Sequence, residues 1–183
     1  MKIVVISDSH GRMLDVYDAV ERECPDAVIH LGDCYEDACE LRRSYPDLPV
    51  YAVLGNNDWG ADAPLQSVVT LEGVRIYLTH GHRDGACFSS PGNVPAHAAE
   101  QDCQLALFGH THIVYHAMHG TVEVLNPGSI SLPRRGGASY AVLMLNAGRV
   151  ECITLHDTQG GLWDPEKKEA KKVGMVLKHA VSH

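Results

Sequence analysis

The sequence lacks a long hydrophobic segment, and it lacks cysteine pairs at the spacing typical of zinc or redox sites. Its longest apolar runs fall far short of the ~20 residues that a membrane-spanning helix requires. The apolar segment before Ser7 is too short for a secretion signal, so we expect a cytoplasmic protein. No two of the six cysteines are three residues apart, which excludes a CxxC motif and favours reduced thiols.

The sequence also has little positive charge, with 15 Lys and Arg residues against 23 Asp and Glu residues. The net charge of −8 argues against strong binding to nucleic acids or acidic membrane surfaces. If the protein binds phosphate groups, a source other than Lys and Arg must supply most of the positive charge. A hydrophobic content of 45% and a charged content of 21% are ordinary for a globular domain and exclude extensive disorder.

The first half of the chain alternates between short buried strands and amphipathic helices. Continuous apolar runs rich in β-branched residues indicate the strands, and apolar side chains at i, i+3, i+4 and i+7 indicate the first helix. We predict strands at 2–6, 27–31 and 50–54, a helix at 36–44, and a helix whose apolar stripe covers 13–20 and which Cys24-Pro25-Asp26 ends. This repetition predicts right-handed crossovers and a parallel sheet.

The second half is richer in strands, with turns predicted at Glu72-Gly73 and at Asn146-Ala147-Gly148. We predict a loop at 81–95, a short helix at 97–101, and strands at 67–71, 74–79, 105–108, 113–117, 121–125, 139–145 and 150–155. Two sheets packed face to face with outer helices would fit this count. We therefore expect a catalytic domain at 1–155 and a tail at 156–183, with a helix beginning at Asp164-Pro165.

Potential metal ligands follow five of the predicted strands. They are Asp8 and His10, Asp33, Asn56, His80 with His82, and His110 with His112. The carboxyl ends of parallel strands form the crevice where ligands bind in α/β sheets, so these segments are expected to converge. Side chains at i and i+2 of an extended chain point the same way, so each Asp-x-His or His-x-His pair can face one centre.

The chemistry of this ligand set restricts the metal. Carboxylate, amide and imidazole ligands without thiolates favour Mn, Fe, Zn or Ni over Ca or Mg. Seven ligands are too many for one ion with an open position and suit two ions that share one carboxylate. Two divalent ions, less two carboxylates and a bridging hydroxide, leave a local charge of about +1, which attracts a phosphate and supports in-line displacement at phosphorus.

These residues resemble the motifs of the calcineurin-like metallophosphoesterase superfamily, and most closely those of its small, single-domain YfcE-like phosphodiesterases. The matching segments are Asp8-Ser9-His10-Gly11, Gly32-Asp33, Gly55-Asn56-Asn57-Asp58, Thr79-His80-Gly81-His82, Gly109-His110-Thr111-His112 and Asn126-Pro127-Gly128-Ser129. The resemblance implies a four-layer α/β/β/α sandwich, with two mixed sheets between outer helices. It further implies that a hydroxide bridging two metal ions, manganese being favoured, attacks phosphorus in line.

Residue roles follow from the same resemblance. Asp8, His10 and His112 would hold one metal ion and Asn56, His80 and His110 the other, with Asp33 bridging them. The turn at Asn126–Ser129 would support the loop that carries His110 and His112. The candidate catalytic residues are Asp33 and Asn56 from this assignment, and His82 as a further candidate near the site.

The substrate side of the site is less determined. Many relatives have His where this chain has Asn57, which leaves the general acid unassigned and predicts slow turnover of poor leaving groups. His82 either donates to the phosphate or leaving oxygen, or supports a ligand, or faces solvent. Asn57 and Arg12 are candidate substrate-binding residues, and Arg134-Arg135 could also reach a phosphate.

Two further residues are candidates for orienting the ligands. Asp58 could orient His80 or His110, and His30 could act similarly or make an ordinary core hydrogen bond. The predicted function is a phosphodiesterase acting on a small phosphorylated substrate. The alternatives are a phosphomonoesterase, including a protein phosphatase or nucleotidase, and a non-catalytic scaffold. The sequence does not determine the oligomeric state, and a homo-oligomer is one possibility.

Overall fold

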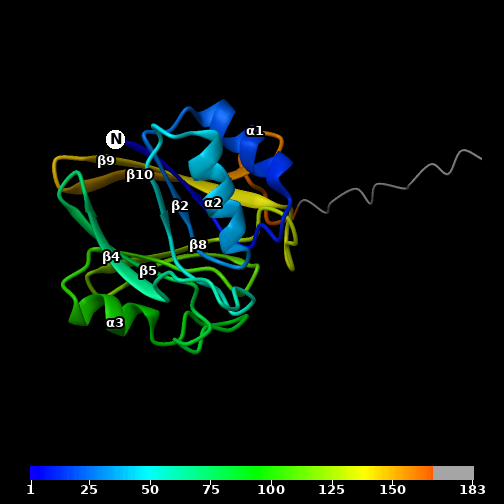
Figure 1. Ribbon diagram of the computed structural model, residues 1–183. Helices are drawn as coiled ribbons and strands as arrows, with labels where there is room; N and C mark the ends of the chain where they lie inside the picture. The colour runs from blue at the N-terminus through cyan, green and yellow to red at the C-terminus, as the bar shows by residue number, and fades with distance from the viewer. Residues whose placement is uncertain (167–183) are drawn as a thin grey trace, which may run out of the picture.

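Two five-stranded sheets pack face to face in the computed structural model, which describes residues 1–166 (Figure 1). The first sheet has the order β10 (Arg149–Asp157), β9 (Ser139–Asn146), β1 (Lys2–Ile6), β2 (Ala27–His30), β3 (Val50–Ala52). The second has the order β4 (Gln66–Leu71), β5 (Val74–Thr79), β6 (Leu105–Leu107), β8 (Val122–Pro127), β7 (Val114–His119). Strands β1–β3 are parallel, as are β5, β6 and β8, and the other neighbours are antiparallel.

Helices cover the outer face of each sheet. Helices α1 (Met13–Glu23) and α2 (Tyr35–Ser44) lie on the first sheet, and α3 (Val94–Glu100) lies on the second, at the opposite side of the molecule (Figure 1). This arrangement confirms the predicted four-layer sandwich. Among the described residues, no helix is both long and apolar enough to cross a bilayer.

The period-two pattern of β1 explains how one strand serves two cores. Ile3 and Val5 belong to the cluster between the sheets, whereas Val4 and Ile6 pack against α1 and α2. All four side chains are fully buried, and burying one such side chain stabilises the fold by roughly 1.5–3 kcal/mol. A buried parallel strand therefore shows a continuous apolar run in the sequence.

Several predicted boundaries differ from the observed ones. Strand β3 ends at Ala52, before the predicted residue 54, because the chain leaves the sheet there and Leu54 N donates to Pro64 O (2.8 Å). Helix α3 begins at Val94, earlier than predicted, with Pro95 in its first turn. Proline is well tolerated there because the first-turn amides have no partner within the helix.

The chain beyond the predicted domain boundary at 155 still contacts the sandwich. Strand β10 runs to Asp157, and Trp163 donates its backbone N–H to Leu155 O (2.9 Å) and its Nε1–H to Gly137 O (3.1 Å). The division into a domain and a tail stays a prediction. The helix predicted from Asp164 onward lies almost entirely outside the described residues, of which 164–166 are the last.

The topology brings the loops that follow β1, β2, β3, β5 and β6 to one end of the sandwich. The backbone N–H of Asp8 donates to Gly32 O (3.1 Å), and that of Gly109 donates to His80 O (3.1 Å). The backbone N–H of His110, from the second sheet, donates to Asp8 Oδ2 of the first (3.2 Å). This edge carries all the predicted ligands.

Candidate metal centre

The loops at this edge hold their polar side chains in an unusual backbone conformation. Asp8, His10, Asp33, His110 and His112 all have positive φ values, between 48° and 66°. Left-handed backbone is uncommon for residues other than glycine and costs free energy, so it persists only where surrounding contacts impose it. The concentration of such residues at one place marks it as a candidate functional site.

Two glycines allow these loops to approach one another closely. A Cβ atom at Gly55 would overlap the Asp33 carboxylate, and one at Gly109 would overlap the Ser7 hydroxyl. Neither position has a φ that demands glycine, so space is the reason for the residue. These contacts bring the β3 loop against the β2 loop, and the β6 loop against β1.

One group of candidate ligands consists of Asp8, His10, Asp33 and His112. Each offers an oxygen or nitrogen, and these four atoms all lie within 4.8 Å of one another. His112 Nε2 is 3.1 Å from Asp8 Oδ1 and 3.4 Å from His10 Nε2. Imidazole nitrogens and carboxylate oxygens that converge from separate loops form a suitable site for a divalent transition metal.

A second group adjoins the first through Asp33. His80 Nε2 lies 3.4 Å from Asp33 Oδ1 and 3.2 Å from Asn56 Oδ1. The ring of His110 packs edge-on against that of His80, with 5.2 Å between centroids. All seven residues predicted as ligands are therefore brought together, with Asp33 common to the two groups.

Backbone carbonyls set the tautomers of two of the histidines. His80 Nδ1 is 2.7 Å from Leu31 O, and His112 Nδ1 is 2.6 Å from Leu132 O. A carbonyl oxygen can only accept, so each Nδ1 carries the proton and donates it. In the neutral form of each ring, the Nε2 atom then has a lone pair directed into the cluster, which is the usual arrangement for metal-binding imidazoles.

The Asp8 carboxylate tests whether the site suits a cation. Asp8 is fully buried, and its Oδ1 accepts no well-directed hydrogen bond from the described residues, although His112 Nε2 lies 3.1 Å away. Burial by itself would raise the Asp8 pKa, but His112, His80 and the Ser7 hydroxyl outweigh it and lower the pKa. An ionised, buried oxygen without a partner is costly, and a cation shared with the imidazoles would satisfy it.

Asn57 does something different from what we predicted. Its backbone N–H donates to Asp33 Oδ1 (3.0 Å), and its Nδ2 donates to Asp33 Oδ2 (2.7 Å). In this structure the Asn57 amide is committed to the shared carboxylate, and its role in substrate binding stays a prediction. Asn57 orients Asp33 from both ends.

Asp58 also departs from the prediction that it orients His80 or His110. Its Oδ1 accepts from the N–H groups of Cys34 (2.9 Å) and Tyr35 (2.6 Å), and its Oδ2 from those of Asp33 (3.1 Å) and Gly55 (2.7 Å). Burial would raise the Asp58 pKa, but these four donors lower it overall. Asp58 therefore holds the β2 and β3 loops together and satisfies amides at the start of α2.

His30 supports the first loop rather than a ligand ring. Its Nδ1 accepts from Gly32 N (3.2 Å), so its Nε2 donates to Ser9 Oγ (2.8 Å). Ser9 donates in turn to Asp37 Oδ2 (2.6 Å), which also accepts from Gly11 N (2.8 Å). Complete burial lowers the His30 pKa to about 4, so the ring is neutral at physiological pH.

The remaining substrate-side candidates surround the cluster. The His82 ring lies 5.5 Å from that of His80, and its Nδ1 is buried without a hydrogen bond within the described part of the chain. Arg12 is engaged by Ser131 O (3.0 Å) and Asp15 (3.2 Å), which leaves it less free for a phosphate than predicted. The Arg134 guanidinium lies over the Phe88 ring, 4.9 Å from its centroid.

The turn after β8 has the supporting role that its motif implied. Asn126 Nδ2 donates to Gly109 O (2.8 Å), and Ser129 Oγ donates to Asp8 O (2.8 Å). Sequence reasoning missed Ser131, which makes a second hydrogen bond to Asp8 O (2.8 Å), and Ser9. Ser9 lies inside the first motif and could have been questioned there, whereas Ser131 carries no signal in the sequence.

Comparisons with known proteins agree with this geometry. A family model described as the calcineurin-like phosphoesterase superfamily domain matches residues 1–148. The Bacillus subtilis protein "Probable metallophosphoesterase YsnB" is 36% identical over 149 residues, covering 79% of this chain and 85% of the relative. The Escherichia coli protein "Phosphodiesterase YfcE" is 38% identical over 118 residues, covering 59% of this chain and 58% of the relative.

Solved structures show the same fold. A predicted phosphoesterase from Streptococcus pneumoniae superposes with a TM-score of 0.73 at 30% identity, covering 91% of this chain and 94% of that one. Vacuolar protein sorting 29 from Cryptosporidium parvum superposes with a TM-score of 0.72 at 18% identity, covering 89% and 94% of the two chains, and this likeness concerns the fold alone.

A double-sheet sandwich with histidines, aspartates and an asparagine at one edge is the arrangement of a metallophosphoesterase. The chain belongs to the calcineurin-like phosphoesterase superfamily, as the match over residues 1–148 shows.

Proposed function

We propose that the protein is a phosphodiesterase that works with two divalent transition-metal ions, manganese being favoured over iron, zinc or nickel. Asp8, His10 and His112 would hold one ion, Asn56, His80 and His110 the other, and Asp33 both. The observation that carries this proposal is the buried Asp8 Oδ1, which has no hydrogen bond in the described residues yet faces imidazole nitrogens. A pair of cations would explain why the chain buries this oxygen.

Such a centre supplies Lewis acidity, which lowers the pKa of water and offsets charge on the phosphoryl oxygens. The protein's own contribution is preorganisation. Asn57 holds both oxygens of Asp33, and the carbonyls of Leu31 and Leu132 hold the rings of His80 and His112. Partners of this kind raise metal affinity because they fix the orientation of each ligand before the ion arrives.

One observation favours a diester over a monoester, and a second favours good leaving groups in either kind of ester. The E. coli relative named phosphodiesterase is 38% identical over the matched segment. In addition, the side chain after Asn56 is a neutral amide committed to Asp33, so it offers no proton to a departing alkoxide. Aryl esters need little protonation to leave, and we therefore expect them to react faster than alkyl esters. A cytoplasmic location and a small phosphorylated substrate remain part of this proposal.

The test combines metal analysis with paired assays. Purified protein should contain about two transition-metal ions per chain, and with manganese it should hydrolyse bis(p-nitrophenyl) phosphate faster than p-nitrophenyl phosphate. Asp33→Asn keeps the shape of the side chain but removes its charge. We expect the hydrolysis rate to fall by at least ~100-fold and the bound metal content to fall as well. Asp62→Asn, at an exposed site, is the matched control.

Two results would contradict parts of this proposal. A clear preference for the monoester would replace phosphodiesterase by phosphomonoesterase. Bound metal without hydrolysis of either ester would instead favour the scaffold alternative.

A further inference from the structure

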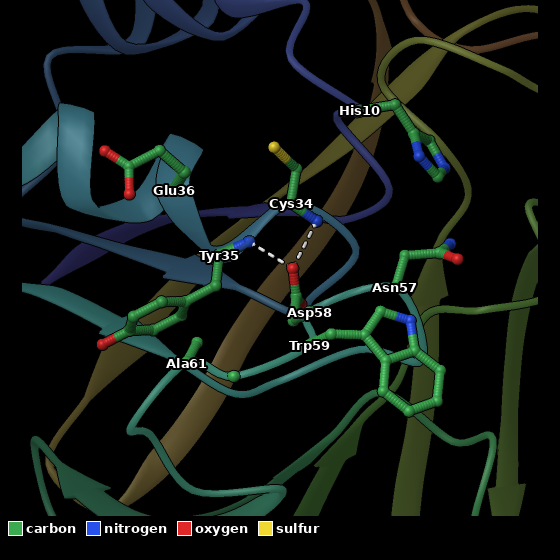
Figure 2. A pocket seen from close by; sticks show the side chains of 9 residues that line it. His10, Cys34, Tyr35, Glu36, Asn57, Asp58, Trp59 and Ala61 are labelled. Atoms are coloured by element: carbon green, nitrogen blue, oxygen red, sulfur yellow. Dashed lines mark hydrogen bonds between the residues drawn. The ribbon is translucent and has the colours of Figure 1, made fainter.

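A pocket of about 570 Å³ lies beside the metal centre. His10, which belongs to the candidate metal centre, and Asn57, which holds Asp33, also line this pocket, so the pocket adjoins the centre. Figure 2 shows His10, Asn57 and Trp59 on one side of the pocket and Glu36 and Tyr35 on the other. Its volume is in the range of small-molecule sites.

The pocket is unsuited to a phosphate. Its lining contains no Lys or Arg, and it does contain the carboxylates of Glu36 and Asp58. The backbone N–H groups of Cys34 and Tyr35, at the start of α2, could otherwise attract an anion, but both already donate to Asp58 Oδ1 (Figure 2). The phosphoryl group of a substrate would therefore lie at the metal centre, and an uncharged part of it would enter the pocket.

The pocket also offers little net attraction to a cation. Asp58 is saturated by four backbone donors, and Glu36 pairs with Arg43 at 2.6 Å. The Tyr35 ring already has the Arg42 guanidinium over it, 5.5 Å from its centroid, while Arg42 donates to the Tyr35 hydroxyl (3.0 Å). The Tyr35 ring is therefore held in place by Arg42, which already occupies it as a cation.

Trp59 is the residue that gives the pocket a preference for flat aromatic groups. Its indole is 90% exposed although it is the largest side chain lining the pocket. An exposed indole beside a reaction centre presents a flat apolar surface, on which bases and aryl rings stack with little dependence on their identity.

We infer that this pocket binds a planar aromatic ester group of the substrate, an aryl ring or a nucleobase, stacked on Trp59. The inference rests on the proposed function, because it requires the phosphoryl group to lie at the metal centre. Trp59 is thereby a specificity-determining residue, and it takes no part in holding metal.

The test measures binding to manganese-loaded, full-length protein by calorimetry, with phosphonates, which have no ester bond, and with phosphate monoesters, whose integrity is checked after each titration. Phenylphosphonate should bind about tenfold more tightly than methylphosphonate, since stacking of one ring contributes that order of affinity. Adenosine monophosphate distinguishes a nucleobase from an aryl ring as the preferred group. Trp59→Ala should bring phenylphosphonate, adenosine monophosphate and methylphosphonate to nearly equal affinity, while metal content and methylphosphonate affinity stay unchanged. Trp59→Phe should retain part of the preference.

Leu162→Ala removes another exposed hydrophobic side chain and is the control that should change nothing. An unaltered aromatic preference in Trp59→Ala, or its loss in Phe88→Ala instead, would overturn the assignment. Tighter binding of phosphorylcholine than of either aromatic ligand would also overturn it, because the pocket would then prefer a cationic group. If methylphosphonate itself fails to bind with metal present, the proposed function fails and takes this inference with it. If methylphosphonate binds and the aromatic ligands gain nothing, only the pocket assignment fails.

Discussion

The four hydrogen bonds to Asp58 permit a quantitative prediction for Asp58→Asn. The substitution keeps the volume and one carbonyl oxygen, which can still accept from the N–H groups of Cys34 and Tyr35. The new NH₂ group then faces the N–H groups of Asp33 and Gly55, and two donors oppose two donors. Two charge-assisted bonds are lost, each contributing about 1.5–3 kcal/mol when shielded from water.

The site is only partly buried, so water replaces some of what is lost. We expect the free energy of unfolding to fall by about 2–4 kcal/mol. Urea denaturation of the metal-free protein, followed by circular dichroism, measures this directly, and Asp62→Asn controls for the removal of one negative charge. A change below about 0.5 kcal/mol would refute the reasoning, because it would mean that the two hydrogen bonds from Asp33 and Gly55 contribute no net stability to the fold.

The remaining predictions concern the neighbouring residues. Asn57→Ala removes the Nδ2 donor to Asp33 but keeps the backbone donor, so manganese affinity should fall by about 10–100-fold in a metal titration. Unchanged affinity would contradict the role of Asn57 in orienting Asp33. Gly109→Ala forces a Cβ against the Ser7 hydroxyl and should lower stability by about 1–3 kcal/mol in thermal unfolding, whereas Gly120→Ala, with open space around its Cβ, tests strain from φ alone. The His30 pKa of about 4, against 6.5 in the unfolded chain, means that the unfolded state binds more protons between these pH values. The stability contributed by neutral His30 is thus present above pH 6.5 and is lost as pH falls towards 4, by roughly 3 kcal/mol in all. Urea unfolding of metal-free wild type and His30→Gln across that range should show the steeper pH dependence in wild type, and equal slopes would disprove the assignment.

A layer of buried polar residues lies directly behind the candidate metal ligands and supports them. Ligand side chains with strained backbone are held by a layer of hydrogen bonds from His30, Ser9, Asn126, Ser129 and Ser131. These residues touch carbonyls and loop side chains, and they fix the loops that carry the candidate ligands. Preorganisation of this kind is what allows a site to bind metal without first ordering its own loops.

The set of candidate ligands could be assembled from local patterns, and its role in binding metal stays a prediction. Asp8, Asp33 and His80 each follow a run of buried apolar residues. The alternation of strands and helices in the first half predicts a parallel sheet, whose strands have their carboxyl ends at one edge. The motifs then assign the residues by order along the chain. Boundaries at β3 and α3 were less predictable, because they depend on where the chain leaves the sheet and on how Pro95 enters a first turn.

Hydrogen-bond partners were beyond the reach of the sequence. Asn57 and Asp58 are adjacent polar residues after Asn56, and nothing local says that one binds the Asp33 carboxylate and the other the amides around it. That choice depends on a loop path shaped by contacts between β2 and β3.

Periodicity and strand-end chemistry therefore determine which residues form the sandwich and which can hold a metal, because both depend on neighbours in the chain. The partners of each polar group, and the exposure of Trp59 beside the centre, arise from packing between segments far apart in sequence. Such contacts as Ser131 to Asp8 leave no local pattern, since their geometry exists only after the two sheets have come together.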